Sequence, residues 1–123
     1  MTQKKLLIVD DHAGVTGVIR ATAETLGFSC RIVNRPEEAF PVFKVFAPDV
    51  LILDMMMPEK DGIDVLEEIL RTDIETRFIL TSGYGDGFLR MGERIVRGAR
   101  ETSVTFLKKP FRREELVAAL NGV

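Results

Sequence analysis

The middle of the chain carries the run Val50-Leu51-Ile52-Leu53-Asp54, in which four apolar residues lead directly to an aspartate. A short run that is apolar at each position is typical of a parallel strand, because helices cover both faces of such a sheet. Similar runs return along the chain, and longer amphipathic stretches that suit helices separate them. We therefore expect five strands, over residues 6–10, 29–33, 50–54, 77–81 and 104–108.

The stretches between the runs predict helices that begin near five residues, namely Val15, Pro36, Gly62, Phe88 and Arg112. Gly27 is placed to end the first helix, since glycine suits the left-handed position after a helix. Pro41 removes a helical hydrogen bond, so we expect the second helix to start late, kink or split. Strands and helices that alternate in this way predict an α/β, doubly wound (βα)5 fold, with helices on both faces of a five-stranded parallel sheet.

The composition limits both the size and the class of the protein. Its 123 residues, of which 46% are hydrophobic, suit a single domain over residues 1–123. The 17 basic and 19 acidic residues leave a net charge of -2, which argues against a nucleic-acid partner. The lone cysteine, Cys30, allows neither an internal disulfide nor a thiolate zinc site, so we expect a cytoplasmic protein. No stretch suits an export signal or a membrane span.

Polar and charged residues gather where the expected strands end. Asp10 and Asp11 close the first strand, Asp54 the third and Thr81 the fourth, and Lys109 follows the fifth. Ligands of such folds bind at the carboxyl ends of the strands, so these side chains should meet at one edge of the sheet. Three carboxylates that repel one another favour proton uptake or a bound divalent cation, and an oxygen-rich site suits Mg2+.

A cation, a metal ion and a hydroxyl around one carboxylate are the groups that a transferring phosphoryl group needs. Lys109 supplies positive charge and Thr81 supplies a hydroxyl donor, which together can balance the charge on the phosphoryl oxygens. An aspartate that attacks phosphorus forms an aspartyl phosphate, a known form of covalent catalysis. His12 follows the acidic pair, and we expect it at the rim of the loop, where it would at most tune access to the site.

Four segments at the strand ends form a recognisable set, and together they span nearly the whole chain. They are Leu7-Ile8-Val9-Asp10-Asp11, then residues 48–58 with Asp61-Gly62 following, then Ile79-Leu80-Thr81-Ser82, and finally Phe106-Leu107-Lys108-Lys109-Pro110-Phe111. Each segment alone is a weak signal, but their order and placement resemble the receiver domains of two-component response regulators. The resemblance implies a flavodoxin-like sheet with the strand order 2-1-3-4-5, in a stand-alone single-domain receiver.

The resemblance also implies a role for each residue at the strand ends. Asp54 would be the phosphoacceptor and would take its phosphoryl group from a sensor histidine kinase or a histidine phosphotransfer protein. Asp11 would bind Mg2+ directly and Asp10 through water, with Asp54 and the main-chain carbonyl of Met56 as further ligands. Lys109 would pair with the acceptor carboxylate or with the phosphoryl oxygens.

The same resemblance places Thr81 and Phe106 at switch positions, where a hydroxyl drawn toward the phosphate is coupled to an aromatic ring that turns inward. Output would pass to a downstream protein partner, or to a second copy of the chain, through the face made by the fourth helix, fifth strand and fifth helix. The domain would catalyse only its own phosphotransfer and dephosphorylation, and it would bind neither nucleic acid nor membranes.

The expected fourth helix is rich in arginine. Its predicted buried face consists of Leu89, Met91, Ile95, Val96 and Ala99. Its arginines recur at spacings of three or four and so share one side of the helix, at positions Arg90, Arg94, Arg97 and Arg100. No acidic partners accompany them at matching spacing, so we interpret this side as a solvated face, with docking onto an acidic protein surface as the alternative.

Three other functions share parts of this pattern. A haloacid dehalogenase-like, Mg2+-dependent phosphatase also forms an aspartyl phosphate, but its nucleophile lies in an Asp-x-Asp arrangement, whereas Asp10 and Asp11 are adjacent. A flavodoxin-like flavin site would have to hold a phosphate beside these two aspartates. A receiver-like interaction module without phosphorylation would keep the fold and lose the chemistry.

Overall fold

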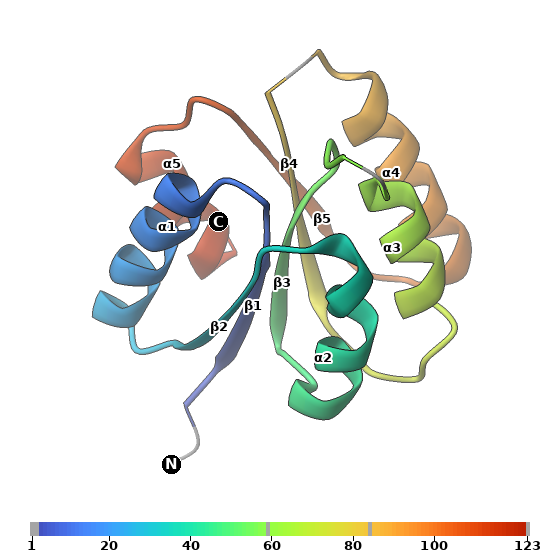
Figure 1. The fold of residues 1–123 in the computed structure, drawn as a ribbon, viewed down its shortest axis with the longest axis horizontal. Coiled ribbons are helices and arrows are strands. Elements are labelled where there is room, and N and C mark those ends of the chain that lie inside the picture. Colours follow the sequence, from blue (N-terminus) through green and yellow to red (C-terminus); the bar gives the residue numbers. More distant parts are fainter. Residues whose placement is uncertain (1–2, 59, 84, 123) are drawn as a thin grey trace.

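The computed structural model describes residues 3–58, 60–83 and 85–122. Its sheet consists of five parallel strands in the order β2-β1-β3-β4-β5, so the predicted topology is confirmed (Figure 1). The strands are β1 (Lys5–Val9), β2 (Ser29–Val33), β3 (Val50–Asp54), β4 (Arg77–Ser82) and β5 (Val104–Lys108). The central strand, β3, is buried along its whole length, as expected when helices cover both faces.

Helices cover the two faces of the sheet unequally. One face carries α1 (Ala13–Thr25) and α5 (Arg113–Asn121), and the other carries α2 (Ala39–Phe46), α3 (Gly62–Ile69) and α4 (Gly87–Ala99) (Figure 1). Side chains alternate between the faces along each strand, so the core divides into two clusters. Leu6, Ile8 and Ile52 lie under α1 and α5, whereas Leu7, Leu51 and Leu53 lie under the other three helices.

The helix boundaries follow the predicted signals with small shifts. The first, fourth and fifth helices begin at Ala13, Gly87 and Arg113, within two residues of the prediction. The second helix starts late, as predicted: residues 36–38 form a 3₁₀ turn, and α2 begins after it. Pro41 therefore lies in the first turn of α2, where a missing N–H costs no helical hydrogen bond. Gly27 follows α1 with a φ of +90°, which suits glycine.

The predicted buried face of α4 is partly wrong. Leu89 and Val96 are buried, but the Met91 side chain is exposed by 50% and Ala99 is exposed. The residue that seats the helix is instead Gly92, where an added Cβ would lie 2.7 Å from Leu80 Cδ1 and 2.9 Å from Met55 Cε. Hydropathy does not mark such a position, because glycine has no side chain whose character could be read.

The prediction that the α4 arginines lack acidic partners is also wrong. Arg90 Nη2 lies 3.7 Å from Asp86 Oδ2, and Arg97 Nε lies 3.3 Å from Glu93 Oε2, each four residues apart on the helix. Arg100 turns away from solvent and donates to main-chain carbonyls at the carboxyl end of α3 and in the loop after it, among them that of Ile74. No helix in the described ranges is long and apolar enough to cross a membrane.

Candidate functional site

Strand alternation brings four of the predicted site residues to one face of the sheet, at its carboxyl edge. Asp10, Asp54, Thr81 and Lys109 share the alternation of Ile8, Ile52, Ile79 and Leu107, which lie under α1 and α5. Asp10 and Lys109 lie one residue beyond their strands, but the ladder continues through them. The Asp10 amide donates to the Val33 carbonyl at 3.1 Å, and the Lys109 amide donates to the Ser82 carbonyl at 2.9 Å.

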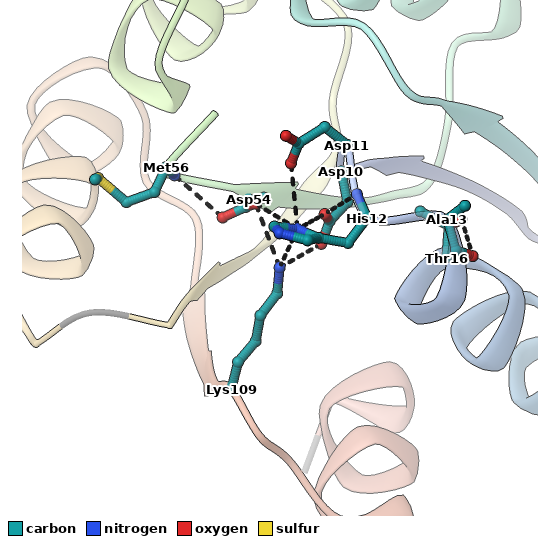
Figure 2. A network of polar contacts seen from close by, with 8 residues as sticks. All are labelled: Asp10, Asp11, His12, Ala13, Thr16, Asp54, Met56 and Lys109. Carbon is teal, nitrogen blue, oxygen red and sulfur yellow. Dashed lines mark hydrogen bonds and ion pairs between the residues drawn. The ribbon is translucent and has the colours of Figure 1, made fainter. Parts of the chain in front are cut away.

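Asp10, Asp11, His12 and Asp54 form a compact cluster, here called the acidic group (Figure 2). Their candidate ligand atoms all lie within 4.8 Å of one another. The Asp10 and Asp54 side chains are buried, whereas that of Asp11 is 26% exposed. A cavity of about 580 Å³ opens beside the group, and its lining includes Asp11, Asp54 and Lys109. A molecule in solution can therefore reach carboxylates that are otherwise enclosed.

Lys109 is the cation of the group, as predicted. Its Nζ lies 2.7 Å from Asp10 Oδ2 and 3.3 Å from Asp54 Oδ2, and its side chain is only 15% exposed. Burial favours the neutral amine and acts to lower the pKa of Lys109, but the two carboxylates outweigh burial and raise the pKa above its ordinary value. The ammonium therefore keeps its charge at neutral pH.

The environment of Asp54 disfavours its charged form. Burial is the largest cause and raises the pKa of Asp54, and the nearby charge of Asp10 acts in the same direction. The Met56 amide, which donates to Asp54 Oδ1 at 3.1 Å, and the Lys109 ammonium oppose this shift without cancelling it. A second positive charge beside Asp54 would therefore relieve a cost that the fold imposes.

Replacing Asp54 by asparagine is expected to stabilise the protein by about 1 kcal/mol at pH 7.5 in EDTA. Because the folded-state pKa of Asp54 lies above the ordinary 3.8, the wild type loses stability as pH rises through the folded value. The gain of Asp54→Asn should therefore shrink as pH falls toward 3.8. Urea unfolding at pH 7.5 and pH 4 measures the free energy of unfolding of Asp54→Asn and of the wild type. Asp73→Asn, at an exposed position, is the control. If Asp54→Asn differs from the wild type by the same free energy at both pH values, this account is contradicted.

Thr81 and Phe106 occupy different faces of the sheet. Thr81 pairs with Asp54 across β3 and β4, and its Oγ1 is buried without a hydrogen-bond partner in the described part of the chain. Phe106 pairs with Leu80 across β4 and β5 and packs, partly buried, onto the core under α4. A buried hydroxyl without a partner costs free energy, so Thr81 is ready to bond an acceptor that arrives beside Asp54.

The donor set fits Mg2+. Three carboxylates offer hard oxygen ligands, and two of them are buried where a cation would relieve their repulsion. Met56 lines the same cavity as Asp54, and its role as a carbonyl ligand stays a prediction. No thiolate belongs to the group among the described residues.

Sequence reasoning placed His12 at the rim of the site but did not predict the direction of its ring. Its side chain is 61% exposed, as the predicted rim position implies, but its Nδ1 turns inward to the acidic group rather than toward solvent. That nitrogen lies 2.9 Å from Asp10 Oδ1, 3.2 Å from Asp11 Oδ1 and 3.8 Å from Asp54 Oδ2. The adjacency of His12 to two site aspartates was the available signal, but it does not give the direction of the ring.

Comparison with known proteins places the chain in a family. The family model described as the response regulator receiver domain matches residues 6–121. The chemotaxis protein CheY of Thermotoga maritima is 32% identical, over 98% of this chain and 97% of its own length. The receiver domain of the Francisella response regulator 1452 superposes with a TM-score of 0.79 at 26% identity, over 96% of this chain and 93% of that structure.

Some relatives are longer than this chain. The probable transcriptional regulator ycf27 of Guillardia theta is 34% identical over 99% of this chain, which covers 46% of that regulator. The transcriptional regulatory protein TrcR of Mycobacterium tuberculosis is 29% identical over 97% of this chain, which covers 44% of its length. The chain therefore spans less than half the length of these two regulators.

Proposed function

The chain belongs to the response regulator receiver domain family, and from this premise we propose that Asp54 accepts a phosphoryl group in a two-component phosphorelay. The observation that carries the proposal is the meeting of three carboxylates with Lys109 beside an open cavity. The donor we propose is a sensor histidine kinase or a histidine phosphotransfer protein. The only catalysis we assign to the chain itself is this phosphotransfer and the later hydrolysis of the product.

The proposed step is an in-line displacement at phosphorus. An oxygen of Asp54 forms the new bond as the bond from phosphorus to the donor nitrogen breaks, and the donor leaves with that electron pair. The Met56 amide and Lys109 Nζ hold the two Asp54 oxygens from different sides, and Lys109 is placed to bind the phosphoryl oxygens. Asp10, Asp11, Asp54 and the Met56 carbonyl would hold Mg2+, which supplies positive charge when bound.

We propose that Thr81 and Phe106 carry the switch. The unpartnered Thr81 hydroxyl gains a hydrogen bond when a phosphoryl oxygen arrives on Asp54, and β4 shifts toward the site. Phe106 lies beside Leu80 on the other face of the sheet, so a shift of β4 changes the space available to its ring. In this way phosphorylation of Asp54 on one face of the sheet would change the packing of Phe106 on the face that α4 covers.

Incubation with acetyl phosphate and Mg2+ is expected to add a single phosphoryl group to the wild type and none to Asp54→Asn. EDTA should prevent the addition, because the three carboxylates then have only the Lys109 ammonium as a counter-charge. Intact mass spectrometry measures both results, and the exposed Asp73→Asn variant should be modified like the wild type. Phosphoryl uptake by Asp54→Asn would mean that another residue is the acceptor. If the wild type takes up no phosphoryl group, an interaction module without phosphorylation is favoured.

We propose that the face made by α4, β5 and α5 passes the signal to a downstream protein. Arg94 is exposed and has no ion pair in the described part of the chain, and exposed Met91 lies beside it on α4. An unpaired cation next to an apolar side chain suits a partner that offers a carboxylate beside an apolar contact. A second copy of the chain is the other occupant we consider for this face.

Reversal of charge in Arg90→Glu with Arg94→Glu is expected to abolish capture of the downstream partner in pull-downs. Arg71→Glu reverses the charge of an exposed arginine in the turn after α3; it serves as the control and should leave capture unchanged. If the Arg90→Glu, Arg94→Glu double variant captures as much partner as Arg71→Glu, these α4 arginines do not bind the partner. Phosphoryl uptake, measured in parallel, should be the same for all three proteins.

The phosphatase alternative gains no support, because the family model that matches is that of the response regulator receiver domain.

A further inference from the structure

The acidic group contains one nitrogen donor in addition to its oxygens. His12 Nδ1 lies within 4 Å of a carboxylate oxygen from each of Asp10, Asp11 and Asp54, at 2.9, 3.2 and 3.8 Å. Figure 2 shows the imidazole between these aspartates and Lys109, with its Nδ1 at the centre of the dashed contacts. A nitrogen that three carboxylates surround lies where a cation bound by those carboxylates would also come within reach.

The backbone fixes the root of this side chain. His12 is the residue that precedes α1, its amide donates to Asp10 Oδ1 at 2.9 Å, and its carbonyl accepts from Val15 and Thr16. The imidazole itself forms no cap on α1. The start of the helix therefore fixes the backbone of His12. In the described part of the chain, the polar contacts of its ring are made with the three aspartates and with Lys109 Nζ, the latter at 3.4 Å.

Oxygen and nitrogen ligands select different metals. Mg2+ prefers oxygen and keeps several waters, whereas the affinity of imidazole rises from Mn2+ through Co2+ to Ni2+. We propose that the group is a mixed oxygen and nitrogen site in which His12 Nδ1 is a direct ligand of a divalent first-row transition metal. His12 thereby sets the metal preference of the site. This inference rests on the proposed function only in that the same carboxylates hold the cation.

The test compares metal affinities of the wild type and His12→Phe by titration calorimetry at pH 8, with no phosphodonor present. Phenylalanine keeps a planar ring on an exposed side chain and removes both nitrogens, and no helix cap is lost. The variant should lose at least about tenfold in Ni2+ affinity, while its Mg2+ affinity changes by less than about threefold. Equal Ni2+ affinities in the two proteins would overturn the inference.

A second measurement reports the bond itself. Pulsed electron paramagnetic resonance of the Mn2+-loaded wild type should detect coupling to one imidazole nitrogen, and His12→Phe and His12→Gln should both lack it. Wild-type protein that binds Mn2+ without this coupling contradicts the role of His12 and leaves the phosphorylation proposal standing. A wild type that binds neither Mg2+ nor Ni2+ overturns this inference and the metal dependence of the proposed function together.

Discussion

Replacing Lys109 by glutamine is expected to slow phosphoryl uptake from acetyl phosphate by about 100-fold or more. A fixed donor aimed at the charge that develops in a transition state has an effect of this size in other enzymes. Lys109 Nζ is the one ammonium within 4 Å of Asp54 among the described residues, so no neighbouring lysine can substitute for it. The initial rate of phosphoryl uptake, followed by mass spectrometry at saturating Mg2+, measures the loss.

The same substitution should lower the free energy of unfolding by about 3 kcal/mol in EDTA. It leaves two buried carboxylates without their cation, and breaking a buried pair from one side is costly. Mg2+ should restore part of this loss, because it supplies the missing positive charge.

Lys108→Gln is the matched control, since it changes the neighbouring residue in the same way. Lys108 is 61% exposed and pairs with Asp86 rather than with the acidic group. Its replacement should alter stability by less than about 1 kcal/mol and leave the uptake rate near that of the wild type. If Lys109→Gln and Lys108→Gln lose the same uptake rate and the same stability, the loss comes from the lower net positive charge and not from the position of Lys109.

Replacing Gly62 by alanine is expected to destabilise the protein by about 3 kcal/mol and to slow phosphoryl uptake. The added Cβ would lie 2.7 Å from both Cα and Sδ of Met55 and 3.1 Å from the carbonyl oxygen of Asp54. Two of these atoms belong to the backbone, so the clash cannot be relieved by turning a side chain, and overpacking of this kind costs up to about 3 kcal/mol. The loop after Asp54 must move instead, which displaces the acceptor.

Gly87→Ala provides the comparison, because Gly87 is the first residue of α4 as Gly62 is of α3. A Cβ at Gly87 meets nothing within 4 Å, so the free energy of unfolding of Gly87→Ala should equal that of the wild type or be slightly higher. Urea unfolding and uptake rates of the two variants check both statements. If Gly62→Ala unfolds like Gly87→Ala, close packing at α3 does not position Asp54.

The sequence was sufficient for the five strands and for the meeting of the aspartates with Lys109, whereas the strand order was implied by the resemblance to receiver domains. The strands and the meeting follow from regular geometry: apolar runs mark the strands, and alternation places Asp10, Asp54, Thr81 and Lys109 on one face. The late start of α2 was also predictable, because proline acts on the hydrogen bonds of its own turn.

The tertiary structure alone decided the direction of the His12 ring, the seat of α4 on Gly92 and the isolation of the Thr81 hydroxyl. The pairing of Arg90 and Arg97 could have been read from their i−4 neighbours, but the folding back of Arg100 onto carbonyls near the end of α3 could not. Periodicity along the chain records which face a residue occupies. It does not record which atoms from distant segments surround that residue, and those contacts fix a rotamer, a close approach or an unmet hydrogen bond.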